Sequence, residues 1–514
     1  MLSLTALNAI EGLDWTHAVL TAVGLTSLWY IASSVVAWYT LRHVPGPFFA
    51  SFSNIWAFWI MCGGSSHITL EAERKKHGHL FRIGPDAVAI SDSEAWNEIN
   101  SARSTYTRGV WYESSRFDYR GASIISELDV SKHNKRKPKL ATAFSGKNVA
   151  ILEAKADKWI TALIRTIRSK IADGNETMDI GRVIQYFQVD LISELSIGKA
   201  WNDLEEDKDQ FGYLKMSDWA IPAVGSMGFL PLVRALYGSI WLMKLLGPKT
   251  TDPSGLGLFL GILEKEVESR FNRSALKSDQ SHDILDEWIK HGLSATECQL
   301  DLALLVPAGA ETSVMMIRGT LLHLMSSPVI YQKVKQEIKD GIAAGRISSP
   351  VTNEEAKSLE YMQAVVREGL RIMVPVNFGF PKRVPAPGDT LCGTFLPAGT
   401  DVYVNYHSMM RSKEVFGEDA DTFRPERFLG SGPSVAHMIK VVDLAFGNGR
   451  FICLGKVLAW LEMNKIFIEL LRNFDFQIAN PEKPWNRTGY TTWIVSDFWA
   501  RVTEDTTMGD GERL

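Results

Sequence analysis

Cysteine is scarce in this chain: its 514 residues include only four, Cys62, Cys298, Cys392 and Cys453. They lie far apart and form no Cys-x-x-Cys pair, which argues against a disulfide framework and a zinc ribbon. The chain also has little excess of either sign of charge. The formal net charge is only -4, so no overall field draws the chain to nucleic acid. Hydrophobic residues make up 46% of the chain, and its length would allow several domains with large cores.

Charged side chains are missing altogether from residues 15–41, which contain no Asp, Glu, Lys or Arg. A helix needs about 20 apolar residues to cross a bilayer core, so we expect a transmembrane helix over residues 18–38. A cleaved signal peptide does not fit, because no Lys or Arg precedes the run and the run is too long. Arg42 follows the run. Basic flanking residues stay in the cytosol, so the bulk of the protein is expected there.

The sequence Val-Pro-Gly-Pro at residues 44–47 follows the predicted span. Proline ends a helix and stiffens the backbone, so this segment separates the globular part from the membrane. We therefore expect a membrane anchor with its hinge (residues 1–44), a globular part (45–505) and a disordered tail (506–514).

The strongest chemical signal is the stretch Phe-Gly-Asn-Gly-Arg-Phe-Ile-Cys-Leu-Gly at residues 446–455. Cys453 stands just before a helix-forming run, where free amide N–H groups and the helix dipole favour a thiolate. Gly449 and Gly455 permit a tight turn and the close approach of a flat ligand. Such a thiolate can be the axial ligand of a haem iron, and Arg450 can pair with a haem propionate. The alternative is a buried structural cysteine beside a turn.

The full pattern Phe-x-x-Gly-x-Arg-x-Cys-x-Gly resembles the haem-binding signature of the cytochrome P-450 family. The resemblance implies a mainly α-helical fold with small peripheral β-sheets around haem b, preceded here by one transmembrane helix. It makes Cys453 the axial ligand of the haem iron. It also implies that four other residues of the stretch bind the cofactor, namely Phe446, Gly447, Arg450 and Gly455.

Residues 132–139 form a basic run, and a charge run by itself is most often a solvated face. In the family, a helix at this place carries Trp or His and, four residues later, Arg, which both reach the haem propionates. His133 and Lys137 have this spacing, although lysine offers a point charge where arginine offers a bidentate grip. Arg383 matches a further propionate-binding arginine. The remaining basic residues of the run are expected to receive an acidic electron-transfer partner.

A second chemical stretch is Ala-Gly-Ala-Glu-Thr-Ser at residues 308–313, within a long apolar helix. Gly309 lets this helix pass close to a planar ligand, and the Thr312 hydroxyl can bend the hydrogen-bond ladder. Glu311 is an acid on an apolar element, so it has a partner or a task. The stretch resembles the oxygen-activating motif of the family, which implies that Thr312 and Glu311 deliver protons during O–O cleavage. Pro307 removes one more helix N–H and should enlarge the kink.

Glu368 and Arg371 are spaced one helical turn apart, which by itself is a common surface pattern. Arg427 follows in the sequence Phe-Arg-Pro-Glu-Arg-Phe. In the family, a glutamate and two arginines at these places form a buried network that holds the segment before the cysteine loop. The resemblance implies the same structural role for these three residues, and it covers the chain from the anchor to about Val502.

The region 219–246 is unusually apolar, and residues 106–120 are aromatic and polar without periodicity. In the family, the first region covers the substrate and touches the membrane; plain core packing is the alternative. The usual His-Pro after Arg371 is replaced here by Met-Val-Pro at residues 373–375, beside the family's substrate loop. The candidates for the substrate pocket are therefore Trp111, Phe117, Met227, Phe229, Val374 and Val376.

The function that the resemblance implies is insertion of one oxygen atom from O2 into a lipophilic small molecule. Electrons come from NADPH through NADPH-cytochrome P-450 reductase, with cytochrome b5 as an optional second partner, and the thiolate assists O–O cleavage. The protein is then a single-pass protein of the endoplasmic reticulum membrane, in contact with lipid, with domain 45–505 as a cytosolic catalytic domain. No nucleic-acid partner is expected.

Details near residues 416–420 and 474–476 look most like fungal members that act in natural-product pathways, on terpenoid, polyketide or alkaloid-like substrates. Two alternatives remain open. One is a haem-thiolate isomerase or dehydratase that does not use O2, which an intact Glu311 and Thr312 disfavour. The other is a non-catalytic haem sensor, which the apolar covering region disfavours because that region suggests a substrate pocket.

Overall fold

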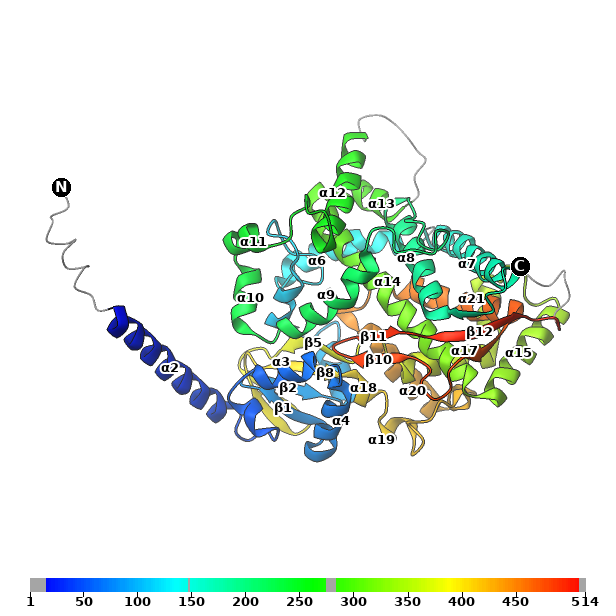
Figure 1. The fold of residues 1–514 in the computed structure, drawn as a ribbon. Helices are drawn as coiled ribbons and strands as arrows, with labels where there is room; N and C mark the ends of the chain where they lie inside the picture. The colour runs from blue at the N-terminus through cyan, green and yellow to red at the C-terminus, as the bar shows by residue number, and fades with distance from the viewer. Residues whose placement is uncertain (1–14, 147, 274–282, 508–514) are drawn as a thin grey trace.

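A computed structural model describes residues 15–146, 148–273 and 283–507 (Figure 1). Helices form most of this part of the chain, and small sheets lie at its periphery. The expected mainly α-helical fold is confirmed. The expected tail, 506–514, lies outside the described residues from 508 onward.

The helices differ widely in length. In chain order they are α2 (Trp15–Thr40), α3 (Ile55–Cys62), α4 (Ser66–His77), α5 (Ser93–Ile99), α6 (Val130–Ala141), α7 (Asn148–Ala172), α8 (Ile180–Ile197), α9 (Tyr213–Met227), α10 (Pro231–Gly238), α11 (Ile240–Leu246), α12 (Gly255–Arg273), α13 (Ile284–Lys290), α14 (Ala295–Met325), α15 (Pro328–Ala343), α16 (Asn353–Lys357), α17 (Glu360–Ile372), α18 (Tyr406–Met409), α19 (Lys413–Phe416), α20 (Pro433–Asp443) and α21 (Lys456–Asn473). Short 3-10 helices are η1 (Phe48–Ser51), η2 (Val110–Ser115), η3 (Thr142–Phe144), η4 (Pro425–Phe428), η5 (Leu444–Phe446) and η6 (Gly449–Phe451).

The strands form small, mostly antiparallel sheets. A five-stranded sheet has the order β1-β2-β8-β5-β3, in which β2 and β8 are parallel; a three-stranded sheet has the order β4-β12-β9, and β6-β7 and β10-β11 are hairpins. The strands are β1 (Leu80–Gly84), β2 (Ala87–Ile90), β3 (Thr107–Arg108), β4 (Thr177–Asp179), β5 (Phe378–Arg383), β6 (Gly388–Leu391), β7 (Thr394–Pro397), β8 (Asp401–Asn405), β9 (Phe474–Ile478), β10 (Asn486–Gly489), β11 (Trp493–Ser496) and β12 (Trp499–Glu504).

Helix α14 organises the interior. Its N-terminus has a capping box, in which Ser294 and Glu297 satisfy each other's backbone N–H groups. Its side chains are buried along most of its length, against α8, α12, α17 and α21. A helix that is apolar on all sides lies either in a core or in a membrane, and the contacts of α14 place it in the core.

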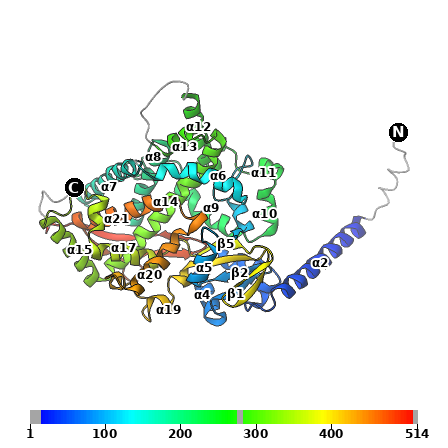
Figure 2. The ribbon, with the colours of Figure 1, turned by 180° about the vertical axis from the view of Figure 1, so that it is seen from behind.

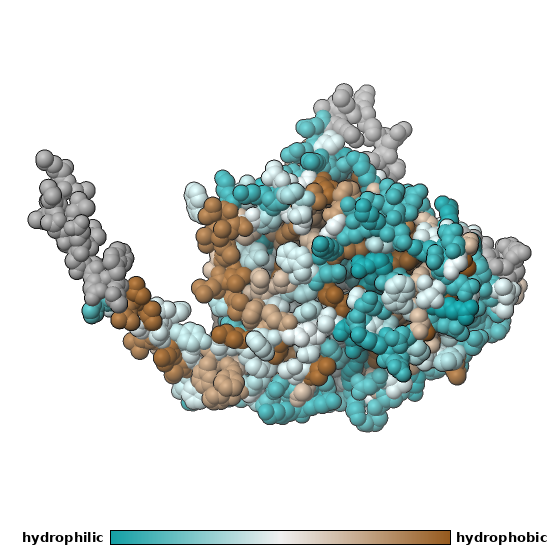
Figure 3. All heavy atoms as spheres, in the orientation of Figure 1, coloured by the Kyte–Doolittle hydropathy of each residue, from teal (hydrophilic) through white to brown (hydrophobic). Residues whose placement is uncertain are grey.

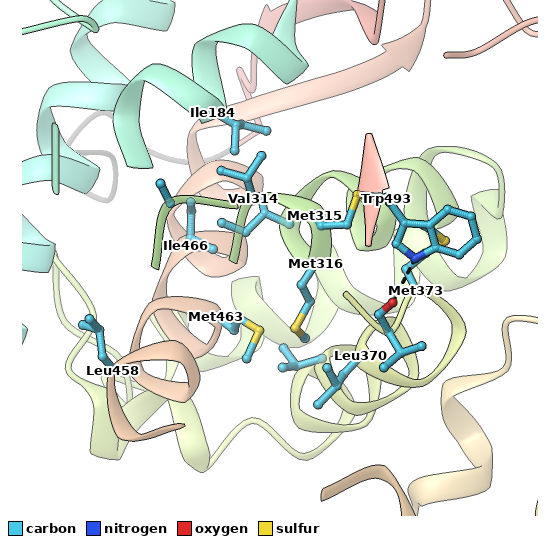
Figure 4. Packing of buried hydrophobic residues seen from close by; sticks show 14 of the residues in the cluster. Ile184, Val314, Met315, Met316, Leu370, Met373, Leu458, Met463, Ile466 and Trp493 are labelled. Carbon is cyan, nitrogen blue, oxygen red and sulfur yellow. Dashed lines mark hydrogen bonds between the residues drawn. The ribbon is translucent and has the colours of Figure 1, made fainter. Parts of the chain in front are cut away.

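Buried hydrophobic side chains from distant parts of the chain interlock around α14. Figure 4 shows Met316 of α14 close to Met463 of α21 and to Leu370 of α17. Nearby, the Trp493 indole donates to Val374 O at 2.9 Å. Full burial of one such apolar side chain stabilises the fold by about 1.5–3 kcal/mol, so these contacts hold the helices in fixed relative positions.

Helix α2 projects away from the globular body in both ribbon views (Figures 1 and 2). It is long and apolar enough to cross a bilayer, and none of its most apolar window is buried in the protein. Its base is held by Arg82 of β1, which is 1% exposed. The guanidinium donates to the carbonyls of Ala37 at 2.8 Å and of Trp38 at 3.3 Å. A cation at the C-terminal end of a helix satisfies free carbonyls and the helix dipole.

An apolar surface on α10 and α11 lies on the same side of the body as α2. Figure 3 shows these hydrophobic side chains as a continuous patch. Leu232 is 86% exposed and Trp241 is 84% exposed, whereas single apolar side chains are normally scattered over a surface. Other exposed members on these two helices are Ile240, Leu242, Leu245 and Leu246. A patch of this kind marks a contact with another apolar phase.

Candidate active site

The loop that carries Cys453 is closed by backbone hydrogen bonds. The Cys453 amide donates to Phe446 O at 2.8 Å, and the amides of Gly455 and Lys456 interact with the Cys453 sulfur. Gly447 has a φ of 71°, in the left-handed region that favours glycine. The loop thus presents its sulfur at the start of α21, as the sequence predicts.

The two glycines expected to admit a flat ligand have different surroundings. A Cβ atom on Gly449 would lie 2.3 Å from Asn100 O, so this glycine is needed where the loop touches the segment after α5. A Cβ atom on Gly455 would lie 3.9 Å from the Cys453 sulfur, which is ordinary contact. Of the two, only Gly455 has its bare side next to the cysteine.

The Cys453 side chain is exposed, and yet burial by its surroundings raises its pKa. Both facts hold for a group that faces an enclosed space rather than bulk water. The Gly455 amide, the charge of Lys137 and the Lys456 amide act in the opposite direction but do not outweigh the burial. The expectation that the helix start alone yields a thiolate is therefore incomplete. A bound metal cation deprotonates a coordinating thiol outright.

Lys137 and His133 of α6 both reach the cysteine loop. The Lys137 ammonium donates to Arg450 O at 2.7 Å and to Ile452 O at 2.9 Å. The His133 ring centre lies 4.9 Å from that of Phe451, and burial lowers the pKa of His133 to about 4. The histidine is therefore neutral at neutral pH and serves as a hydrogen-bonding group rather than a cation.

Phe451 lies at the centre of a group of cations. The Lys382 ammonium lies 3.7 Å from its ring centre, and the guanidinium carbons of Arg108 and Arg450 lie 4.6 and 5.9 Å away. Burial lowers the pKa of Lys382 well below its ordinary value, lowers that of Arg108, and lowers that of Lys137 to about 8. Within the described part of the chain, none of these four cations forms an ion pair with a carboxylate. Lys382 is buried and the other three are half-buried. Cations withdrawn from water without a partner are costly, so this cluster fits an anionic ligand.

Arg383 does not join this cluster, although the sequence pattern assigns it there. Its guanidinium pairs with Asp401 of β8, with Nε–Oδ1 and Nη2–Oδ2 distances of 2.9 and 3.1 Å. Successive residues of a strand face opposite sides, so Lys382 faces the cluster and Arg383 faces away. Sequence reasoning missed Lys382 and Arg108, and the alternation along β5 was the available signal for Lys382.

The motif on α14 lies where this helix is only partly buried. The Thr312 hydroxyl donates to Ala308 O at 2.8 Å, and Ala308 is exposed within an otherwise largely buried helix. Gly309 has its bare side against α8, where a Cβ atom would meet Ile192 Cδ1 at 2.6 Å. Its lack of a side chain is therefore explained by helix packing, not by the approach of a ligand.

Glu311 points toward α8 and α9. Its carboxylate accepts from the Tyr213 hydroxyl at 3.3 Å and from the Gln185 amide at 3.4 Å. Burial raises the pKa of Glu311; a hydrogen bond from Ser217 and the charge of Arg318 counteract part of this effect. The acid is thus enclosed among polar groups and holds its proton to a higher pH than a solvated glutamate does.

The structure brings Glu368, Arg371 and Arg427 together in a buried network. Arg371 Nε and Nη2 donate to the two Glu368 oxygens at 2.7 and 2.8 Å, and Arg427 Nε donates to Glu368 Oε1 at 3.1 Å. Arg371 Nη1 also donates to Met410 O and Ala420 O at 2.7 and 2.6 Å. A planar fork with both partners in place satisfies buried carboxylate oxygens, and here it ties α17 to the segment before α20.

The candidates for the substrate pocket do not gather in one place. Trp111 and Phe229 lie in an aromatic cluster, where the Trp111 indole donates to Gly225 O at 2.9 Å and Phe229 stacks on Tyr403 with ring centres 5.1 Å apart. Both side chains are buried. Met227 is 37% exposed at the outer end of α9. In this structure these three residues have packing or surface roles.

The remaining pocket candidates lie nearer the interior. Phe117 lines a small cavity together with Leu300 and Ala303 of α14. Val374 is buried and Val376 forms an isolated bridge with Thr492. Loop 106–120 thus contributes Phe117 to the neighbourhood of α14, while its Trp111 packs against α9.

Comparison with known proteins identifies the family. The family model described as cytochrome P-450 matches residues 47–495. The chain is 37% identical to cytochrome P-450 monooxygenase aba1 of Botryotinia fuckeliana, over 90% of this chain and 92% of the relative. It is 34% identical to cytochrome P-450 monooxygenase abl1 of Leptosphaeria maculans, over 96% and 88%. It is 33% identical to cytochrome P-450 monooxygenase ABA1 of Pyricularia oryzae, over 95% and 97%.

Membership of this family implies a haem cofactor, electrons supplied by a reductase and a lipophilic substrate. The apolar helix at residues 17–40 fits attachment to a membrane. The chain belongs to the cytochrome P-450 family and is an oxidoreductase of the monooxygenase class.

Proposed function

We propose that this protein is a haem b-dependent monooxygenase that hydroxylates or otherwise oxygenates a lipophilic natural product. One atom of O2 enters the substrate and the other leaves as water, with the uptake of two electrons and two protons. The observation that carries the proposal is the meeting of a loop cysteine with one buried and three half-buried cations that have no carboxylate partner among the described residues. Relatives named as monooxygenases in three fungi support it.

The residues of this site fit haem. Cys453 would supply the axial sulfur, because it faces an enclosed space at the start of α21. Arg108, Lys137, Lys382 and Arg450 would pair with the two propionates, which offer the negative charge that this cluster lacks. When bound, the haem iron supplies the activation of O2, and a thiolate ligand favours O–O cleavage.

Proton delivery is assigned to Glu311 and Thr312. The raised pKa of Glu311 keeps its proton available to a higher pH, and Tyr213 and Gln185 hold its carboxyl group at a fixed place. The Thr312 hydroxyl donates its one proton to Ala308 O, and its oxygen can still accept a hydrogen bond; once rotated away from Ala308 O, the same hydroxyl can donate in a relay. Positioned proton transfer of this kind contributes about 10²–10⁴-fold to a rate.

The membrane arrangement is assigned from two apolar surfaces. Helix α2 would cross the endoplasmic reticulum membrane once, and the patch on α10 and α11 would rest in its cytosolic leaflet, where apolar side chains leave water. Domain 45–505 would then be the cytosolic catalytic domain. It would accept electrons from NADPH through the reductase, with cytochrome b5 as a second donor, at exposed basic residues such as Lys132 and Lys135.

The proposal is tested first by the absorption spectrum of the reduced, CO-bound protein and then by measurement of substrate turnover. Reduced protein with CO should show the red-shifted Soret band of a thiolate-ligated haem, and Cys453→Ser should lose it. Purified protein with reductase should consume NADPH and O2 faster when an apolar substrate of terpenoid, polyketide or alkaloid type is added. Retention of the band in Cys453→Ser contradicts the ligand assignment. Product formation without O2 or NADPH would replace the monooxygenase proposal by an isomerase or dehydratase.

A further inference from the structure

A buried polar group lies in the helical core outside the site described above. Gln188 of α8 and Glu462 of α21 are 0% and 1% exposed. Figure 4 shows Ile184 of α8, Val314 of α14 and Ile466 of α21 close together where these helices meet. Ile184 and Ile466 stand one helical turn from Gln188 and Glu462, so the two polar side chains belong to the same packed region.

The Gln188 amide joins α14 to α21. Its Nε2 atom donates to Gly309 O at 3.3 Å and to Glu462 Oε2 at 3.2 Å. A side-chain amide nitrogen carries two N–H donors, so both are in use. Ser313, which is also on α14, lowers the pKa of Glu462, so it acts on the same carboxyl group. Three helices thus share one small polar link.

Gly309 makes this link possible. Gln188 and Ile192 are one turn apart on α8, and both approach Gly309. A Cβ atom on Gly309 would lie 2.6 Å from Ile192 Cδ1. Because glycine has no Cβ, α8 comes close enough for the Gln188 amide to reach the carbonyl.

Two successive carbonyls of α14 each accept a side-chain donor at this turn. Thr312 donates to Ala308 O at 2.8 Å, and Gln188 donates to Gly309 O. In a regular helix these oxygens accept only the amide four residues later. A side chain that inserts into this ladder bends the helix, and Pro307 already lacks one N–H. The shape of this turn therefore depends on donors outside the backbone ladder.

We propose that Gln188 and Glu462 are positioning residues that fix the Glu311–Thr312 turn of α14 relative to the helix that follows Cys453. Helix α21 begins at Lys456, directly after the Cys453 loop. The link therefore fixes the position of the Glu311–Thr312 turn relative to that loop. The inference rests on the proposed function, because positioning matters only if this turn takes part in O2 chemistry.

The link is also sensitive to protonation. Burial raises the pKa of Glu462 to about 7, and Ser313 of α14 and Gln188 of α8 lower it in part. No charged side chain of the described residues contributes to this shift. Above that pH the carboxylate accepts from Gln188; below it, one carboxyl oxygen carries a proton and becomes a donor. The geometry of the turn should therefore change slightly across neutral pH.

The first variant is Gln188→Met, which removes both donors at similar volume. Reduced, CO-bound protein should keep the thiolate Soret band but show a shifted CO stretching frequency, because that frequency reports on the groups beside the bound gas. Peroxide released per NADPH should rise several-fold. The matched control is Gln363→Met: Gln363 is buried and donates to Ala356 O at 3.2 Å and to Asn464 of α21 at 3.0 Å. No shift with Gln188→Met, or an equal shift with the control, overturns the proposal.

Two variants of Glu462 separate hydrogen bonding from titration. Glu462→Gln keeps an acceptor for Gln188, so the peroxide released per NADPH should stay at the wild-type level. The CO stretching frequency should lose its pH dependence. Glu462→Leu should behave like Gln188→Met, and wild-type behaviour of this variant contradicts the proposal. If Thr312→Ala does not release peroxide either, the proposed function fails. If Thr312→Ala releases it and Gln188→Met does not, only the positioning link fails.

Discussion

At the scale of single residues, the cations around Phe451 carry most of the information about the ligand. Within the described chain, Lys382 is buried and Arg108 and Lys137 are half-buried, all three without a carboxylate partner. Arg383, next in sequence to Lys382, has such a partner in Asp401. Charges that are unpaired in the protein alone are destabilising until an anion binds. Strain of this kind is typical of binding sites, where stability is given up for function.

Lys382→Met and Arg383→Met should therefore have opposite effects on the stability of haem-free protein and on haem retention. Because burial depresses the folded-state pKa of Lys382, the folded protein binds this proton less readily than the unfolded chain does. The lysine thus destabilises haem-free protein at every pH below its unfolded pKa of about 10.4, and the cost grows as the pH falls toward the folded pKa. Lys382→Met should raise the unfolding midpoint of haem-free protein but weaken haem retention. Arg383→Met should lower the midpoint, because it leaves Asp401 unpaired, and should retain haem.

Measurements of haem content and of urea unfolding at neutral pH check both variants. Loss of haem in Arg383→Met alone, with full haem retention in Lys382→Met, would reverse the assignment of the two side chains.

The turnover rate should fall at high pH as Glu311 of α14 loses its proton, which gives the pH–rate profile a basic limb. Because burial raises the pKa of Glu311, its proton is available up to a higher pH than for a solvated glutamate and is lost as the pH rises through that value. Glu311→Gln should remove this limb and slow turnover by about 10²–10⁴-fold at unchanged haem content. Thr312→Ala should still bind substrate and accept electrons, but release peroxide. Normal rates and normal product per NADPH in both variants would reduce the pair to helix packing.

At the scale of elements, the Glu368 network ties α17 to the segment that leads to the cysteine loop. Glu368→Leu leaves two buried guanidinium groups without their shared carboxylate, and loss of one partner of a buried pair costs about 3–5 kcal/mol. Chemical unfolding of the haem-bound protein should show this loss. The control is Glu418→Gln, in an exposed pair with Lys413, which should leave the unfolding free energy unchanged. Equal effects of the two variants would mean that the network is not structural.

Motifs that act within one element could be predicted from sequence, and contacts that depend on tertiary packing could not. The α2 span, the Glu368–Arg371 spacing and the Cys453 loop are local patterns, and each takes the expected form. The role of Lys382 depends on which face of β5 meets the loop, and the surroundings of Gly309 depend on Ile192, far away in sequence. The aromatic residues of loop 106–120 look alike in sequence, but Trp111 packs against α9 while Phe117 faces α14.

At the scale of the whole molecule, topology can be read from three potential glycosylation sites. Asn175, Asn272 and Asn486 each begin an Asn-x-Ser/Thr sequence, and Asn175 and Asn272 are exposed. If the catalytic domain is cytosolic, all three should stay unmodified in a eukaryotic host, because the modifying machinery is lumenal. An N-terminal tag with its own Asn-x-Thr sequence should be glycosylated in the same molecules. A glycan on any of the three sites would place the domain in the lumen.

The arginine at the base of the anchor also has a mechanical consequence. Arg82 holds the last carbonyls of α2 and donates to Ser51 O at 3.0 Å and Pro85 O at 2.9 Å, so the anchor meets the body at a stiff joint rather than a loose tether. A tethered body samples many orientations, but a body on a stiff joint keeps nearly one tilt against the lipid plane. A partner embedded in the same membrane then finds its docking face already turned toward it. Its search is confined to two dimensions and to few orientations.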